Sequence, residues 1–402
     1  MIGEMLMTAR LNVSQPSDMD ADIERIVGAY SEADRERFSG DLFDIVRLSE
    51  VVRILDANKA SGPGSLRDVL RVCLNLGKTD ASLAWIVGVS NSAWSMRSCF
   101  HSLESSVPAM ERNKLLAMVL GRPGSLKRDY ESDKYFLTGE WKYASGWSYS
   151  SFFFCLAVVE DSNGQDIRVV AVPAEQLELI EAWKSTGLRG TQSVTVRARG
   201  IEIPASNMED YNRILSGENR VHGKAGGNEK HASYSGLFSG VLMNCLLGSM
   251  LGATEAGLEY VVAAADKRPV TGCTYAVMGD SGAIRAEIGR LYSSLDLYKR
   301  VAEYNADVID KAARDPEITL TTQDRLDCRA RATLIMRGCV DTVQDLLWVY
   351  GSAGLDKGNP LEGIWRDVNV GARHGGFSKL VPEEAAGMAI IGRDPKALTR
   401  MF

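Results

Sequence analysis

The spacing of apolar residues changes twice along the chain, and this double change limits the folds that the chain can adopt. Residues 18–120 carry apolar side chains at helical spacing, as at Ile23 and Ile26. Residues 125–207 contain short alternating or continuously apolar runs that are typical of strands, and helical spacing returns after about residue 211. The sequence therefore predicts an α+β, mostly α-helical protein with three domains, which span residues 1–124, 125–208 and 209–402.

Cap and turn residues predict where several elements begin and end. Ser65 is suited to cap a helix that begins near residue 66, and Asp80 or Ser82 is suited to cap the next helix. The run Arg-Pro-Gly at 122–124 is expected to end the N-terminal helical domain.

The middle domain is predicted to be a small antiparallel β-barrel or sandwich. Residues 152–159 are apolar throughout, and the turn sequence Asp-Ser-Asn-Gly at 161–164 leads into a second strand over 167–172. After this domain, three long segments have the apolar spacing of amphipathic helices, namely 237–267, 281–313 and 321–349.

Composition and charge exclude several classes of partner. The chain has 402 residues, of which 45% are hydrophobic and 24% charged, as in a soluble globular protein. Its net charge of −6 argues against binding nucleic acid through bulk electrostatics. The most apolar stretch, 236–265, contains Asn244, Glu255 and Glu259, so we expect a buried helix and no membrane contact.

The cysteine and histidine patterns indicate a cytoplasmic protein without a metal site. The seven cysteines are widely spaced and form no Cys-x-x-Cys pair, and the N-terminal segment lacks the apolar run of a signal peptide. We therefore expect reduced thiols in the cytoplasm. His101, His222 and His231 have no Asp, Glu or His at ligand spacing, so no metal site is predicted.

One stretch, YFLTGEWKYASG at 135–146, combines the groups that bind a flat, heteroatom-rich ring. Gly139 and Gly146 allow a ligand to approach the backbone closely. Ser145 supplies a hydroxyl that both donates and accepts hydrogen bonds, and Trp141 supplies a large flat face. The stretch alone is equally compatible with an ordinary β-hairpin.

Four motifs in this order resemble the acyl-CoA dehydrogenase fold. They are Asp-Ala-Ser-x-Ala-Trp-Ile at 80–86, Gly-x-Trp-x-Tyr-Ala-Ser-Gly at 139–146, Trp-x3-Gly-Leu-Arg-Gly-Thr-x-Ser at 183–193 with Pro204 after it, and Trp-Arg-Asp at 365–367. The resemblance implies a C-terminal four-helix bundle and a flavin that lies between this bundle and the β domain. It also implies that a neighbouring subunit completes the flavin site and that the assembly is a homotetramer.

The residues disfavour the dehydrogenase branch of this family. Acyl-CoA dehydrogenases use a glutamate to remove a weakly acidic α-proton, and it usually lies about ten residues after an Arg-Asp pair. Here Arg366-Asp367 is followed by VNVGARHGG, which contains no carboxylate, and the alternative position near 239–244 contains none either.

The second branch, the two-component flavin monooxygenases (group D flavin-dependent hydroxylases), fits better. Members place a histidine near the position of the dehydrogenase glutamate, as His374 is placed here, and they tend to carry an aromatic-Ala-Ser-Gly sequence, as at 143–146. The resemblance implies that reduced FMN or FAD and O2 form a C4a-hydroperoxyflavin, which hydroxylates a small aromatic or amine, such as an intermediate of natural-product biosynthesis. The chain has no Rossmann motif, so a separate NAD(P)H:flavin reductase is expected to supply the reduced flavin.

The resemblance assigns two catalytic candidates. Ser145 would hydrogen-bond near flavin N5 in a pocket kept dry by Trp141, Tyr143 and Trp147, and Gly146 would also contact the cofactor. Alternatively, the Ser145 hydroxyl only satisfies a turn. His374 would act as a general base or orient the peroxide, or it would only touch its own backbone at the end of a helix.

A second group of residues is expected to contact the cofactor. Arg268 is a candidate for the flavin phosphate or ring, and Gly351, Ser352 and Gly354 offer backbone N–H groups to an anionic ligand. A surface salt bridge and an ordinary loop would also explain these residues. Two other functions stay open, an acyl-CoA dehydrogenase with a relocated base and a non-catalytic descendant that binds a ligand.

Overall fold

The computed structural model describes residues 18–399 apart from 58, 60–61, 101–102, 104–106, 132–133, 161, 163, 219–233, 235, 316 and 379. His101, His222 and His231 lie outside the described residues, as do Asp161 and Asn163 of the predicted turn.

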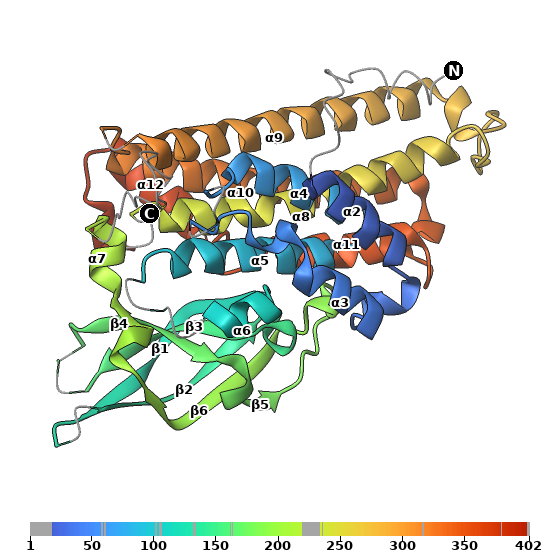
Figure 1. The fold of residues 1–402 in the computed structure, drawn as a ribbon. Coiled ribbons are helices and arrows are strands. Elements are labelled where there is room, and N and C mark those ends of the chain that lie inside the picture. Colours follow the sequence, from blue (N-terminus) through green and yellow to red (C-terminus); the bar gives the residue numbers. More distant parts are fainter. Residues whose placement is uncertain are drawn as a thin grey trace.

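Three long helices form the main body of the C-terminal half (Figure 1). They are α8 (Phe238–Ala264), α9 (Gly282–Arg314) and α10 (Thr322–Tyr350), and their bounds lie within three residues of the predicted segments. The other helices of the described chain are α2 (Asp18–Ala29), α3 (Gly40–Leu48), α4 (Leu66–Thr79), α5 (Ala81–Arg97), α6 (Val107–Arg112), α7 (Tyr211–Ser216), α11 (Pro360–Gly371) and α12 (Val381–Ile390). Two predicted caps are confirmed, because the side chains of Ser65 and Asp80 accept backbone N–H groups at the starts of α4 and α5.

Helix α8 is the core helix of the protein, as its apolar sequence predicted. Its segment Ser239–Ala264 is long and apolar enough to cross a membrane, but 89% of its most apolar window is buried by the rest of the chain. Helices α4, α5, α9, α10 and α11 all contact it. Burial on every side explains why this helix is apolar all round and not amphipathic.

Small residues hold α4 and α8 at an unusually close distance. A Cβ placed on Gly252 would lie 2.1 Å from the carbonyl oxygen of Leu74, and one on Gly77 would lie 2.7 Å from that of Ser249. The two backbones therefore touch directly, and only glycine fits at these positions.

The β domain is one seven-stranded sheet with the order β5-β6-β2-β1-β3-β4-β7. Its strands are β1 (Leu116–Asp129), β2 (Lys134–Ala144), β3 (Phe152–Val159), β4 (Ile167–Pro173), β5 (Glu178–Glu181), β6 (Val194–Ile203) and β7 (Met208–Asp210). The predicted hairpin joins β3 to β4 in antiparallel register. One pair, β1 with β3, is parallel, which the antiparallel prediction did not include.

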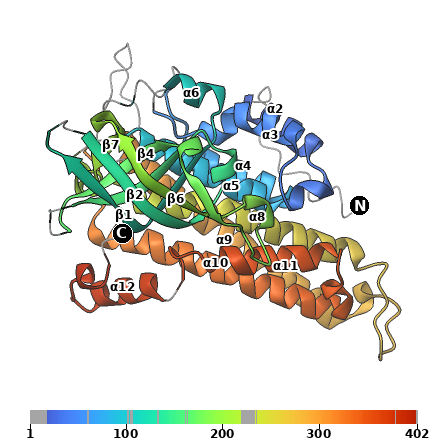
Figure 2. The ribbon, with the colours of Figure 1, turned by 90° about the horizontal axis from the view of Figure 1, so that it is seen from below.

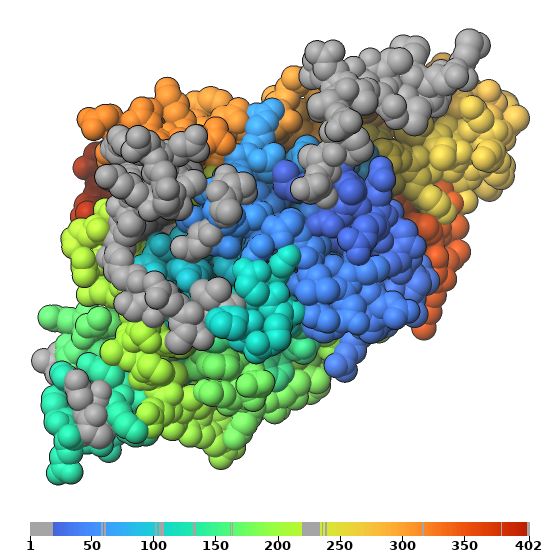
Figure 3. All heavy atoms as spheres, viewed as in Figure 1, coloured from blue at the N-terminus to red at the C-terminus, as the bar shows by residue number. Residues whose placement is uncertain are grey.

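Both faces of this sheet are buried near its centre. Along β3, Phe152 and Phe154 pack against the end of α5 and against α6 and α7, whereas Phe153 and Cys155 point into the core that the sheet encloses. Figure 2 shows the sheet lying beside the helices, and Figure 3 shows the N-terminal helices, in blue, meeting the β domain, in green. Burial on both faces explains the continuously apolar sequence of β3.

The β region begins earlier than the predicted boundary at residue 125. The run Leu-Ala-Met-Val-Leu at 116–120 was assigned to the helical part, but it forms the first half of β1. Its apolar spacing suits either a buried helix or a buried strand. Pro123 is tolerated inside β1 because the register with β3 is interrupted between Val119 and Gly124.

The contact between α4 and α8 gives a matched test of packing. Gly252→Ala is expected to reduce the free energy of unfolding by about 3 kcal/mol, because the new Cβ would overlap the Leu74 carbonyl. Gly289→Ala, in the third turn of α9 with nothing within 4 Å of the new Cβ, is expected to increase it by about 1 kcal/mol through helix propensity. Chemical denaturation of the two variants measures both effects, and equal changes would contradict the packing argument.

Candidate active site

The stretch that follows β2 has a strained backbone. Tyr143 adopts φ 63°, which is left-handed, and the register of β2 with β6 shifts between Trp141 and Ala144. Tyr143 is 67% exposed, and its ring meets that of Trp183 edge to face at 6.1 Å. A left-handed tyrosine costs about 1–2 kcal/mol, and such strain concentrates at functional sites.

Two residues of this stretch that were predicted to contact the cofactor, Trp141 and Gly146, face other parts of the protein. The Trp141 side chain is buried inside the β domain, where its Nε1–H donates to the carbonyl of Leu156 at 3.2 Å. Gly124 and Gly139 both leave room for its ring. Trp141 is therefore a packing residue in this structure and does not present its face to a ligand. Gly146 adopts φ +74°, and a Cβ added there would lie 3.4 Å from Cγ2 of Ile86 in α5.

Ser145 is the half-buried end of a chain of three hydroxyl groups. Its Oγ lies 2.7 Å from Ser193 Oγ, which lies 2.7 Å from Thr191 Oγ1. The Thr191 hydroxyl donates to the carbonyl oxygen of Leu188 at 2.7 Å. A backbone bond from the N–H of Gly146 to the carbonyl of Thr191, at 2.8 Å, joins the same two segments. The hydroxyl of Ser145 is therefore held from the segment before β6.

Helix α11 holds the turn at Leu188, whose carbonyl ends the chain of hydroxyl groups. Asp367 Oδ1 accepts a hydrogen bond from the N–H of Leu188 at 2.6 Å, and Leu188 itself adopts φ 50°. Gly187 lies so close to α11 that a Cβ there would be 2.3 Å from the carbonyl oxygen of Arg366. Burial and the nearby charge of Asp80 raise the pKa of Asp367 to about 7.

His374 lies just beyond the end of α11, between two aromatic rings. The ring centroid of Trp85 is 5.7 Å away and that of Phe377 is 5.8 Å away. The N–H of Gly376 donates to Nδ1 at 3.2 Å, so the neutral imidazole carries its proton on Nε2. Burial lowers the pKa of His374 to about 4, so the side chain is neutral at physiological pH. Its free nitrogen is therefore a hydrogen-bond donor.

Helix α5 connects the two catalytic candidates. The ring of Trp85 lies 5.7 Å from that of His374, and the next residue, Ile86, lies 3.4 Å from where a Cβ on Gly146 would be. The strand end with Ser145 and the helix end with His374 thus approach the same turn of α5. This turn belongs to the motif Asp-Ala-Ser-x-Ala-Trp-Ile, and its first residue, Asp80, caps α5.

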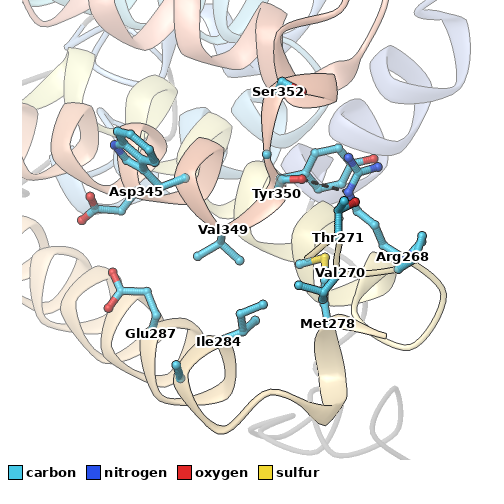
Figure 4. A pocket seen from close by; sticks show the side chains of 14 residues that line it. Arg268, Val270, Thr271, Met278, Ile284, Glu287, Asp345, Val349, Tyr350 and Ser352 are labelled. Atoms are coloured by element: carbon cyan, nitrogen blue, oxygen red, sulfur yellow. Dashed lines mark hydrogen bonds between the residues drawn. The ribbon is translucent and has the colours of Figure 1, made fainter. Parts of the chain in front are cut away.

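The second predicted group of residues lines a separate pocket at the far end of the bundle (Figure 4). This pocket has a volume of about 580 Å³ and lies between the start of α9 and the end of α10. Arg268, Gly351 and Ser352 line it together. The Arg268 guanidinium stacks 4.0 Å from the centroid of the Tyr350 ring, and its Nε donates to the Tyr350 carbonyl at 2.8 Å.

The structure divides the predicted site residues between two places. Gly354 does not line the pocket, since its Cα packs against Leu347 and Tyr350. At the pocket wall, the charges of Glu287 and Asp345 are paired with Arg290 and not with Arg268. Among the described residues, no group of three His, Cys, Asp or Glu side chains could hold a metal ion.

Comparison with known proteins identifies the fold. Residues 245–379 match the family model described as acyl-CoA dehydrogenase, C-terminal domain. The FADH(2)-dependent resorcinol hydroxylase, oxygenase component, of Rhizobium sp. is 24% identical over 348 residues, which are 83% of this chain and 82% of that protein.

Solved structures agree along nearly the whole chain. XiaF from Streptomyces sp., in complex with FADH2 and glycerol, superposes with a TM-score of 0.82 at 23% identity and covers 94% of this chain and 96% of that one. The 3-HSA hydroxylase from Rhodococcus sp. RHA1 gives 0.81 at 16% identity, with 96% and 98% coverage. The chain has the acyl-CoA dehydrogenase fold, as its four motifs predicted.

The raised pKa of Asp367 predicts a pH dependence of stability. Between the unfolded pKa of about 3.9 and the folded pKa of about 7, the folded state holds a proton that the unfolded state has lost, so stability falls as the pH rises through 7. From pH 6 to pH 8, this residue should cost about 1.4 kcal/mol. Asp367→Asn keeps an oxygen for the Leu188 N–H but does not titrate. Thermal melting at both pH values should show a smaller pH effect in the variant, and identical pH effects would contradict this assignment.

The environment of His374 predicts its protonation state. In a 15N-histidine NMR titration, the signal that disappears in His374→Gln should titrate with a pKa near 4 and show the Nε2–H tautomer from pH 6 to pH 8. A midpoint near 6.5 would mean that the imidazole is solvated and is able to act as a base near neutrality.

Proposed function

We propose that this chain is the oxygenase component of a two-component flavin monooxygenase that hydroxylates a small aromatic substrate. The observation that carries this proposal is that the neutral imidazole of His374 and Gly146, the neighbour of the half-buried Ser145, lie beside consecutive residues of α5. The similar proteins support it, because they include a FADH(2)-dependent resorcinol hydroxylase and a flavin-dependent monooxygenase subunit. A separate NAD(P)H:flavin reductase would supply the reduced flavin.

The residues at the strand end fit a reduced flavin ring. The left-handed Tyr143 and Gly146 stand on either side of Ser145, which is half-buried and not sealed in the core. Ser145 would bind the ring at N5, and Arg268 with Gly351 would bind phosphate. Reduced flavin supplies the electrons that activate O2. FMN and FAD both suit these contacts.

The two groups of residues also support a multisubunit enzyme. Arg268, Gly351 and Ser352 lie at the end of the bundle where α8 stops, away from the β domain that carries Ser145 (Figure 1). Trp348, which lines the same pocket, is 80% exposed in the single chain. We therefore assign the two groups to one flavin site shared between copies, in an assembly such as a homotetramer.

We infer that His374 acts as a hydrogen-bond donor toward the substrate. An imidazole with a pKa near 4 is a poor base at neutral pH, and its Nδ1 is already occupied by the N–H of Gly376. Its Nε2–H can instead donate to a phenolic oxygen and orient the ring. This role favours a hydroxylated aromatic substrate over an amine, because a protonated amine offers no acceptor.

The alternative of an acyl-CoA dehydrogenase with a relocated base depends on Asp367. Its pKa near 7 would suit a general base. However, its Oδ1 holds the Leu188 N–H at 2.6 Å, so proton abstraction would compete with the bond that fixes the turn. Bleaching of bound oxidised flavin by acyl-CoA would favour the dehydrogenase.

The decisive experiment mixes anaerobically reduced FMN or FAD and the protein with O2 in a stopped-flow instrument. Bound flavin should reoxidise more slowly than free flavin, and resorcinol or other phenols, with added reductase, should be hydroxylated. His374→Ala should keep flavin binding and lose at least tenfold in turnover, whereas His374→Gln, which retains an N–H donor, should lose less. Reoxidation identical to that of free flavin would overturn the proposed function.

A further inference from the structure

We propose that Ser193 and Thr191 are positioning residues that fix Ser145 as a hydrogen-bond acceptor, so that the site selects flavin whose N5 carries a hydrogen. Such flavin is the reduced form, and oxidised flavin presents a bare N5 lone pair. The inference rests on the proposed function, since it places flavin N5 at Ser145.

The direction of the hydrogen bonds among the three hydroxyl groups follows from the single hydrogen that each one carries. A carbonyl can only accept, so the Thr191 hydroxyl uses its one hydrogen on the Leu188 carbonyl. Ser193 must then donate to Thr191 Oγ1, and Ser145 must donate to Ser193 Oγ. The hydrogen of Ser145 thus points inward, and the lone pairs of its oxygen face the ligand side.

Burial keeps this direction from reversing. Thr191 is fully buried and Ser193 is 7% exposed, so water does not compete for their hydroxyl groups. The Leu188 carbonyl also accepts the Nε1–H of Trp183 at 2.9 Å. The backbone N–H of Leu188 donates to Asp367. Leu188, whose carbonyl is the acceptor at the start of the hydroxyl chain, is therefore held at both its N–H and its C=O.

The chain of hydroxyl groups offers reduced and oxidised flavin different hydrogen bonds at Ser145. The N5–H of reduced flavin can donate to Ser145 Oγ without disturbing any bond in the chain. The N5 of oxidised flavin faces lone pairs, and Ser145 can donate to it only by abandoning its bond to Ser193. One buried hydrogen bond corresponds to about a tenfold preference for the reduced state.

The test compares dissociation constants of oxidised FMN and anaerobically reduced FMN, together with the midpoint potential of the bound flavin. In Ser193→Ala and Thr191→Val, the Ser145 hydrogen is free to turn outward. Oxidised flavin should then bind about tenfold more tightly while reduced flavin binds as before, and the potential should fall by about 30 mV for the two-electron couple. Ser145→Ala should differ, because it weakens the binding of reduced flavin.

Ser249→Ala is the matched control, since this buried serine also donates to a single carbonyl, that of Leu246, but lies within α8. It should leave the ratio of the two dissociation constants unchanged. An unchanged ratio in both Ser193→Ala and Thr191→Val, with wild-type protein that binds flavin, would overturn the inference alone. Wild-type protein that binds neither redox state would overturn the proposed function and the inference together.

Discussion

The candidate site depends on the backbone of Leu188. Its N–H is held by Asp367 of α11, and its C=O is held by Thr191 and Trp183 of the β domain. This single left-handed residue therefore joins the C-terminal helices to the segment that orients Ser145. The raised pKa of Asp367 shows the cost of the arrangement, because a carboxylate has been taken out of water to hold one backbone N–H.

The sequence predicted the helices well because their signals are local. The long helices α8, α9 and α10 follow from apolar spacing, and Ser65 and Asp80 follow from cap chemistry. The start of β1 was missed for a physical reason. Five consecutive apolar residues at 116–120 have no period, so neighbours in the folded protein decide between helix and strand. The parallel pairing of β1 with β3 is likewise set by partners distant along the chain.

The sequence proposed residues for the candidate site but did not supply their geometry. The family resemblance pointed to Ser145, His374 and Arg268, but three facts needed the three-dimensional structure. Trp141 faces the interior, since Gly124 and Gly139 leave space for it there. His374 accepts at Nδ1, which turns a predicted base into a donor. The sequence shows the two hydroxyl groups as Thr-x-Ser at 191–193. It does not show that the Leu188 carbonyl sets the direction of their hydrogen bonds.

The separation of the two residue groups bears on how such a protein controls reactivity. Flavin bound only at Ser145 would leave its phosphate end without Arg268, and flavin bound only at the pocket would leave its ring exposed to water. In a shared site, neither subunit alone holds the whole cofactor, so assembly precedes tight binding. A site that also prefers reduced flavin would release the oxidised product and take up the next reduced molecule. An oxygenase that lacks a nucleotide site of its own and depends on a reductase needs this exchange.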